Sequence, residues 1–153
     1  MFLAWEDAEL VEPVTLKVAS ARMLTDAVRE LVFEAGGGTA LAGFTPGAHV
    51  RFLLAEGERC YSLVDFDAGS APDGASRYRF AVQLEKDGGG GSRFMHGLMP
   101  GDQVQALAPH NDFPLAPGKP ALLIAGGIGV TPVISMAAAL RQAGTPFRFH
   151  YAA

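Results

Sequence analysis

An uninterrupted apolar segment followed at once by a glycine loop and a helical pattern constrains the fold of this chain most. Ala121–Ala125 contains no polar side chain, which is typical of a strand buried on both faces of a parallel sheet. Gly126–Pro132 is the glycine loop, and Val133–Ala143 has the composition of a helix. Phe147–Tyr151 follows as a second strand. The order strand, loop, helix, strand predicts one βαβ unit.

The residues before this unit favour a different, mainly β architecture. Nineteen glycines and ten prolines indicate many turns. Ser92 is predicted to cap a short helix over Arg93–Met99. The composition changes after Pro117-Gly118, so we place a domain boundary near Lys119, which divides the chain into residues 1–118 and 119–153. Short segments with partial alternation predict six strands: Val14–Leu24, Ala27–Ala35, His49–Leu54, Arg59–Val64, Tyr78–Leu84 and Gln103–Ala108.

Arg59-Cys60-Tyr61-Ser62 is the first segment that could carry chemistry. It offers a phosphate ligand, a stacking surface and a hydrogen-bond donor. Side chains alternate along a strand, so Arg59 and Tyr61 should share a face, and Ser62 should point away unless the strand ends or bends there. The alternative is an ordinary strand with an edge arginine. Cys60 is expected to be a buried core residue, because free cysteines are usually buried.

Two glycine loops are the other candidate sites. Gly88–Ser92 precedes the short predicted helix, where glycines would let the backbone approach an anion; the alternative is a flexible hairpin loop. Gly126–Pro132 stands between a strand and a helix, the context that a dinucleotide site requires. Its spacing departs from the usual fingerprint, because Pro132 stands where a third glycine belongs. It indicates a nucleotide or flavin contact.

Taken together, these segments resemble the ferredoxin-reductase superfamily, and most closely its phthalate dioxygenase reductase and vanillate O-demethylase reductase type. The resemblance rests on the order of the three motifs, on Phe44–Val50 and on the Pro109–Leu115 stretch. It runs from about Val14 to Ala153. It implies a six-stranded antiparallel flavin-binding barrel, followed by the first βαβ unit of a parallel α/β nucleotide domain.

The resemblance also implies roles for individual residues. Arg59 would hold the flavin phosphate, Tyr61 would pack on the isoalloxazine ring, and Ser62 would donate a hydrogen bond near flavin N5. Ser62 and Thr131 are the catalytic candidates, and Thr131 would stand where nicotinamide meets the flavin. The remaining cofactor-binding candidates line the ring, the phosphate and the nicotinamide: Val82, Gln83, Leu84, Gly90, Gly91, Ser92, Gly127 and Gly129.

The implied function is that of a flavin-dependent reductase component. It would pass electrons from NAD(P)H through FMN, with FAD as the alternative, to an iron–sulfur centre and an oxygenase partner. Members of the family continue through the nucleotide domain into a ferredoxin domain, whereas this sequence stops at Ala153. The iron–sulfur cluster would therefore lie in a missing domain or a partner. The alternative is a flavin-binding assembly or electron-relay module without its own NAD(P)H oxidation.

Composition excludes several other classes. A net charge of −4 argues against a nucleic-acid partner. The single cysteine forms no internal disulfide and cannot hold an iron–sulfur cluster alone, and the histidines show no metal-site spacing. No segment has the apolar length of a membrane span, and Met1–Pro13 lacks the features of a signal peptide. We therefore expect a cytoplasmic protein.

The βαβ unit carries an expectation of its own. One helix covers only one face of a two-stranded parallel sheet, while both strands are apolar. Burying a large apolar side chain is worth about 1.5–3 kcal/mol, so exposing several is costly. We expect the barrel or a second chain to cover this surface through residues after Lys119, giving a homo-oligomer in the latter case, or else high mobility there.

Overall fold

The computed structural model describes residues 12–38, 40–66 and 74–153. Residues 1–11, most of the N-terminal segment Met1–Pro13, lie outside the described residues, as do residue 39 and residues 67–73, which follow strand β4 (Gly57–Ser62) and precede strand β5 (Tyr78–Gln83). The described chain contains eight strands, two α-helices and one 3-10 turn, η1. Their bounds are β1 Val14–Met23, β2 Val28–Ala35, β3 His49–Leu54, β4 Gly57–Ser62, β5 Tyr78–Gln83, α1 Gly91–Gly97, β6 Gln103–Ala106, β7 Ala121–Gly126, η1 Gly127–Gly129, α2 Val130–Gln142 and β8 Phe147–Ala152.

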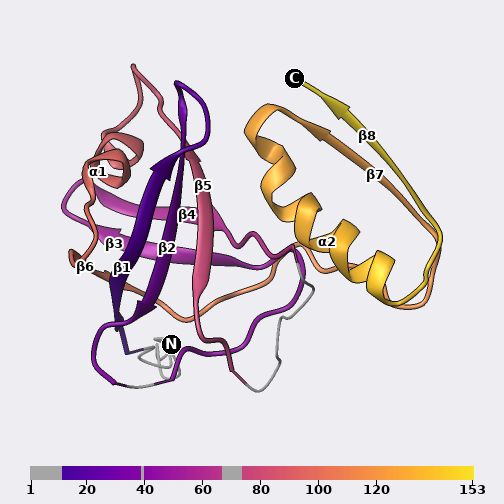
Figure 1. The fold of residues 1–153 in the computed structure, drawn as a ribbon, viewed down its shortest axis with the longest axis horizontal. Helices are drawn as coiled ribbons and strands as arrows, with labels where there is room; N and C mark the ends of the chain where they lie inside the picture. The colour runs from indigo at the N-terminus through magenta and orange to yellow at the C-terminus, as the bar shows by residue number, and fades with distance from the viewer. Residues whose placement is uncertain (1–11, 39, 67–73) are drawn as a thin grey trace, which may run out of the picture.

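The first six strands form one curved antiparallel sheet in the order β4-β3-β6-β1-β2-β5 (Figure 1). This confirms the predicted six antiparallel strands, but the expected barrel is not closed. β4 and β5 are the outer strands, and the described residues contain no ladder between them. The pairing with β3 ends just after Ser62: Leu63 N–H still donates to Ala48 O, but Val64 N–H donates to Arg79 O on β5, each at 2.9 Å.

Aromatic side chains fill the core of this sheet. Phe33, Phe52 and Phe80 are fully buried, and their ring centroids lie 5.2 to 5.7 Å apart in tilted or edge-to-face arrangements. Tilted and edge-to-face rings are favoured because the positive edge of one ring meets the negative face of another. Alternation is clear in β5, where Tyr78, Phe80 and Val82 are buried.

β7, α2 and β8 form the predicted βαβ unit. β7 and β8 pair in parallel, from Ala121 opposite Phe147 to Gly126 opposite Ala152. α2 covers one face, where Leu123 and Ala125 join a second buried cluster. The expectation that β7 is buried on both faces is wrong, because a single helix reaches only one.

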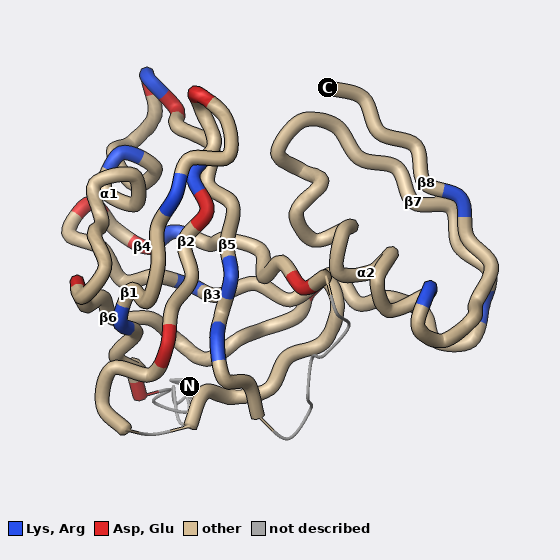
Figure 2. Tube along the Cα trace, in the orientation of Figure 1, with Lys and Arg blue, Asp and Glu red and all other residues tan. Residues whose placement is uncertain are grey.

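The uncovered face of this unit carries large apolar side chains. Leu122 is 60% and Ile124 70% exposed. Figure 2 shows charged residues gathered on the six-stranded sheet and few on this unit, which contains three cations and no acidic residue after residue 118. No described helix is long and apolar enough to cross a membrane.

A glycine turn before β3 brings the segment that connects β6 to β7 close to the six-stranded sheet. Gly47 has a φ of 98°, and a Cβ there would lie 2.0 Å from the carbonyl oxygen of Phe113 and 2.8 Å from Cε of Met136. Only glycine fits this turn. The segment next bonds to β3, since His49 and His110 exchange two backbone hydrogen bonds of 2.8 and 2.9 Å.

The aromatic core yields a stability prediction. Phe33→Ala should lower the free energy of unfolding by about 3–5 kcal/mol, because it removes a fully buried ring and leaves a cavity beside Phe52 and Phe80. Phe113→Ala is the matched control, since Phe113 is 58% exposed, and it should change stability by less than about 0.5 kcal/mol. Urea unfolding measures both. Similar losses in the two variants would contradict this assignment of the core.

Candidate functional site

A cavity of about 390 Å³ occupies the gap between β4 and β5. Three segments that are distant in sequence enclose it: the end of β4, the glycine loop with β5, and the η1 turn with the start of α2. Its lining residues are Arg59, Cys60, Tyr61, Ser62, Ala81, Val82, Gln83, Glu85, Gly89, Gly91, Ser92, Ile128, Gly129, Thr131 and Pro132. The three motifs singled out in the sequence therefore meet at one place.

β4 supplies a cation, a phenol and a hydroxyl to this cavity. Tyr61 is half-buried, and its ring meets Phe52 edge to face at 5.8 Å between centroids. Burial raises the pKa of the Tyr61 phenol above its usual value, Arg59 opposes this shift, and Glu85 adds to it. The ring is therefore neutral at physiological pH. Ser62 lines the same cavity because β4 ends there, which frees its side chain from strict alternation.

The guanidinium of Arg59 lies against the glycine loop. Its Nη2 donates to Gly89 O at 3.1 Å, and its Nη1 donates to Glu58 O at 2.8 Å. A Cβ on Gly89 would lie 2.7 Å from Nη2, and one on Gly91 would lie 2.6 Å from Cγ of Arg59. Such distances are closer than real Cβ atoms tolerate. Glycine at Gly91 leaves room for the middle of the Arg59 side chain, whereas at Gly89 the contact is with its mobile guanidinium end.

Ser92 holds β5 to the glycine loop. It was expected to cap α1, but that expectation is wrong: Gly90, with a φ of 90°, stands at the N-cap, and Ser92 lies inside the helix. Its hydroxyl accepts a hydrogen bond of 3.0 Å from the amide of Glu85, just after β5. A hydroxyl that accepts one bond can still donate its own proton.

The third wall comes from η1 and α2. α2 begins at Val130 and not at Val133 as expected, because Thr131 and Pro132 fit the first helical turn. Thr131 is buried, and its hydroxyl donates to Ile128 O at 3.1 Å. This bond fixes the η1 turn against the start of the helix, so Ile128 and Gly129 face the cavity.

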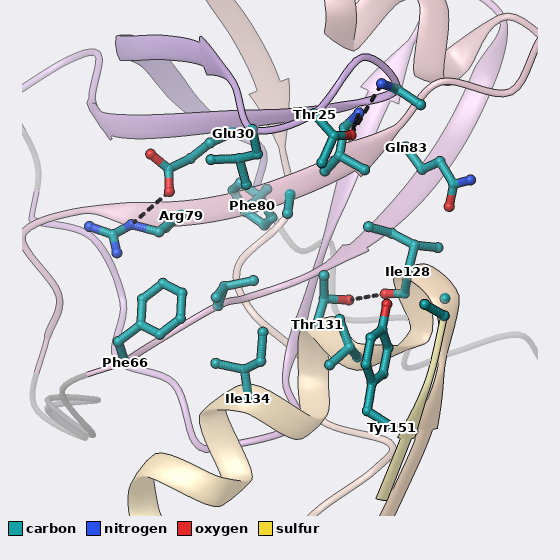
Figure 3. A pocket seen from close by; sticks show the side chains of 18 residues that line it. Thr25, Glu30, Phe66, Arg79, Phe80, Gln83, Ile128, Thr131, Ile134 and Tyr151 are labelled. Atoms are coloured by element: carbon teal, nitrogen blue, oxygen red, sulfur yellow. Dashed lines mark hydrogen bonds and ion pairs between the residues drawn. The ribbon is translucent and has the colours of Figure 1, made fainter.

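A second cavity, also of about 390 Å³, lies beside the first (Figure 3). It separates the outer face of β2 and β5 from η1, α2 and the end of β8. The two cavities share four wall residues, Ala81, Gln83, Ile128 and Thr131. Figure 3 shows Phe66, Ile134 and Tyr151 around this second cavity, so its wall is mostly apolar.

The carboxylate of Glu30, in the wall of this second cavity, is neutralised by two arginines. Glu30 is 8% exposed and accepts a hydrogen bond from Nε of Arg22 at 2.7 Å. Arg79 approaches the other carboxylate oxygen at 3.8 Å and lies over the Phe66 ring, with Cζ 5.4 Å from its centroid. The described residues hold no group of three or more His, Cys, Asp or Glu placed to bind a metal ion.

Nine of the twelve residues that the sequence singled out line the first cavity. Leu84, Gly90 and Gly127 do not. The Leu84 amide turns away to bond Ala27 O at 2.7 Å, a Cβ on Gly90 would face Glu56, and Gly127 lines the second cavity.

The sequence analysis assigned no role to six lining residues: Cys60, Ala81, Glu85, Gly89, Ile128 and Pro132. Four of them lie inside its three candidate segments, and the other two, Ala81 and Glu85, lie next to the candidates Val82–Leu84. Cys60 is exposed and not part of the core, so that expectation is wrong. Cys60 lies on the opposite face of β4 from Tyr61, whose ring contacts the core residue Phe52, and opposite exposed Arg51, so its side chain points away from the core.

Comparison with known proteins gives many relatives, although no established family profile matches the sequence. The chain is 39% identical over 140 residues to the heme-dependent oxidative N-demethylase beta subunit of Ectopseudomonas mendocina, covering 90% of the chain and 43% of the relative. It is 36% identical to the carnitine monooxygenase reductase subunit of Escherichia coli, covering 89% and 43%.

A solved structure agrees with these relatives. The phthalate dioxygenase reductase structure, described as modular for electron transfer from pyridine nucleotides to [2Fe-2S], is 34% identical. It superposes with a TM-score of 0.81, over 91% of this chain and 43% of that one. The chain thus spans less than half the length of these relatives.

The contact of Arg59 with the glycine loop at Gly89 and Gly91, the Arg59 cradle, yields a binding prediction for FMN, the flavin that the family resemblance implies. Gly91→Ala should weaken FMN binding about tenfold or more, because the added Cβ pushes Arg59 away from the loop, and a charge-assisted contact contributes roughly 1.5–3 kcal/mol. Gly97→Ala, in the same helix but with no atom within 4 Å of the new Cβ, is the control. Fluorescence titration measures both affinities. Equal affinities would show that the cradle does not take the phosphate.

Proposed function

The chain belongs to the ferredoxin-reductase superfamily, and on that premise we propose that it is the flavin-binding part of an NAD(P)H-dependent reductase component. Such a component passes electrons through flavin to an iron–sulfur centre and an oxygenase partner. One observation carries the proposal: Arg59, Tyr61 and Ser62 meet the glycine loop and the η1–α2 turn around a single cavity. We assign residues 1–118 to the flavin-binding domain and 119–153 to the nucleotide-binding domain.

The cavity has the groups that a flavin phosphate requires. Arg59 is a permanent cation and a multidentate donor, and it stands beside two glycines whose missing side chains open the backbone. The Ser92 hydroxyl lies in the same wall with a proton to donate. We propose FMN, following the phthalate-type relatives. The same cradle would suit FAD, and the mass of the flavin released from purified protein distinguishes the two.

The remaining walls would receive the flavin ring. Tyr61 offers an uncharged aromatic face, and the edge of β5 around Val82 and Gln83 lies opposite it. Ser62 would donate a hydrogen bond to the ring. When bound, flavin supplies the redox chemistry, taking two electrons as hydride and releasing them singly.

Thr131 lies where the two cavities share a wall. We propose that nicotinamide approaches through the second cavity, with Gly127 and Thr131 at the point of contact. Its apolar wall would exclude water from the transfer, and its Glu30–Arg79 pair leaves little net charge beside the ring. A cytoplasmic location and an iron–sulfur or oxygenase partner complete the proposal.

Arg59→Ala tests the flavin assignment. It should raise the dissociation constant for FMN about ten- to a hundredfold, because it removes a charge-assisted contact worth roughly 1.5–3 kcal/mol. Arg51→Ala is the matched control: Arg51 lies on the neighbouring strand β3, pairs with Glu58 at 3.4 Å and is absent from the cavity wall. Titration of FMN into each protein gives the affinities.

The same preparation tests the redox part of the proposal. Wild-type protein loaded with FMN should lose its visible flavin absorbance on anaerobic addition of NADH. A protein that binds FMN and is not reduced would favour the assembly or electron-relay alternative. A colourless protein with no affinity for flavin, or unchanged affinity in Arg59→Ala, would refute the flavin site.

We also propose that the exposed face of β7 and β8 pairs with a second copy of this chain. Leu122 and Ile124 lie mostly in solvent, next to the open edges of a two-stranded sheet. Ile124→Lys should convert a dimer into a monomer, whereas Met99→Lys, at a 58% exposed residue in the loop between α1 and β6, should not. Light scattering measures the mass. A strict wild-type monomer with strongly protected 147–151 amides would contradict this proposal.

A further inference from the structure

The short segment after β4 bonds to three other parts of the fold. Leu63 donates its amide to Ala48 before β3, and Val64 donates to Arg79 on β5. The third amide, that of Asp65, donates to the side-chain oxygen of Ser135 on α2 at 2.9 Å. The direction of the chain as it leaves Ser62 is thus set by partners on two parts of the six-stranded sheet and on α2.

Ser135 makes a second bond to the same segment. Its hydroxyl donates to Leu63 O at 2.9 Å, so one oxygen donates to one backbone group and accepts from another two residues away. Ser135 is 1% exposed. A buried hydroxyl satisfied in both roles fixes the orientation of the groups that it joins, because rotating it would break one of the bonds.

The two ends of this bridge lie next to the two catalytic candidates. Leu63 follows Ser62 directly in the chain, and Ser135 lies four residues after Thr131, so both side chains are on one face of α2. Ser62 and Thr131 line the same cavity from opposite segments. The bridge is therefore a short, rigid connection between the wall that would hold the flavin ring and the wall that would meet nicotinamide.

We infer that Ser135 is a positioning residue, which sets the placement of Thr131 relative to Ser62 by joining α2 to the end of β4. This inference rests on the proposed function for its consequence, and on Leu63, Asp65 and Ser135 for its geometry. The hydroxyl itself touches neither cavity. It acts through the backbone, and a misplacement of about 1 Å can cost a hundredfold in rate.

Ser135→Ala removes both bonds with little change in volume. In the 153-residue chain loaded with FMN, the variant should exchange the Asp65 amide about tenfold faster, because the amide loses its partner. Anaerobic reduction by saturating NADH should slow about ten- to a hundredfold, while the FMN dissociation constant changes less than about threefold. Ser135→Thr keeps the hydroxyl and should restore both the protection and the rate.

Ala138→Gly is the matched control for a general loss of helix stability. Ala138 lies on α2, is buried, and belongs to neither cavity. Glycine weakens a helix by about 1 kcal/mol relative to alanine, so this variant should melt at a lower temperature without changing the reduction rate or the Asp65 exchange. Visible circular dichroism of bound FMN should change in Ser135→Ala and not in Ala138→Gly.

The outcomes separate this inference from the proposed function. If Ser135→Ala and Ala138→Gly slow reduction equally for equal losses in melting temperature, Ser135 is only structural and the inference is overturned. If wild-type protein binds FMN and is not reduced by NADH, the proposed hydride transfer fails. The circular dichroism and the Asp65 exchange then decide the inference, and unchanged values in Ser135→Ala overturn it.

Discussion

The unclosed hydrogen-bond ladder between β4 and β5 is the constraint on which the rest of this structure depends. Five pairings hold six strands together, and a sixth would fill the gap that forms the site. The gap lies beside β4 itself; past its end, Val64 N–H donates to Arg79 O on β5 and Asp65 N–H to Ser135 on α2, so the chain joins β5 and the helix only after Ser62. Outer strands with unpaired groups are usually a liability; here their free edges become two walls of a cavity.

The positive charge of Arg59 and the missing side chains of the glycine loop act together in that cavity. Arg59 can lie against the loop only because Gly91 carries no Cβ, and the loop keeps its position relative to β5 through the bond from Glu85 N–H to Ser92. The Tyr61 phenol, whose pKa burial raises further above physiological pH, offers an uncharged aromatic face. These features favour a ligand that has a phosphate at one end and a flat ring at the other.

The βαβ unit connects this site to the second cavity. Thr131, in the first turn of α2, stands in the wall shared by both cavities, and Ser135 ties the same helix to the end of β4. A rigid helix that bears on both cavities offers a physical means of aligning two ligands. The apolar face of β7 and β8 opposite α2 is the part of the unit that its own residues leave uncovered.

Sequence alone determined the local structure: the six strands, the βαβ order and the three motifs. These follow from apolar periodicity, from the placement of glycine and proline, and from short-range chemistry, all of which neighbouring residues encode. Tertiary structure decided what depends on distant residues. Strand β4 stops at Ser62 because Val64 N–H turns to Arg79 O on β5. Ser92 bonds Glu85 instead of capping α1, and Cys60 is exposed because it lies on the outer face of β4, opposite exposed Arg51. The role of Ser135 had no sequence signal, because a hydroxyl in a helix gains two partners only when another element packs against it.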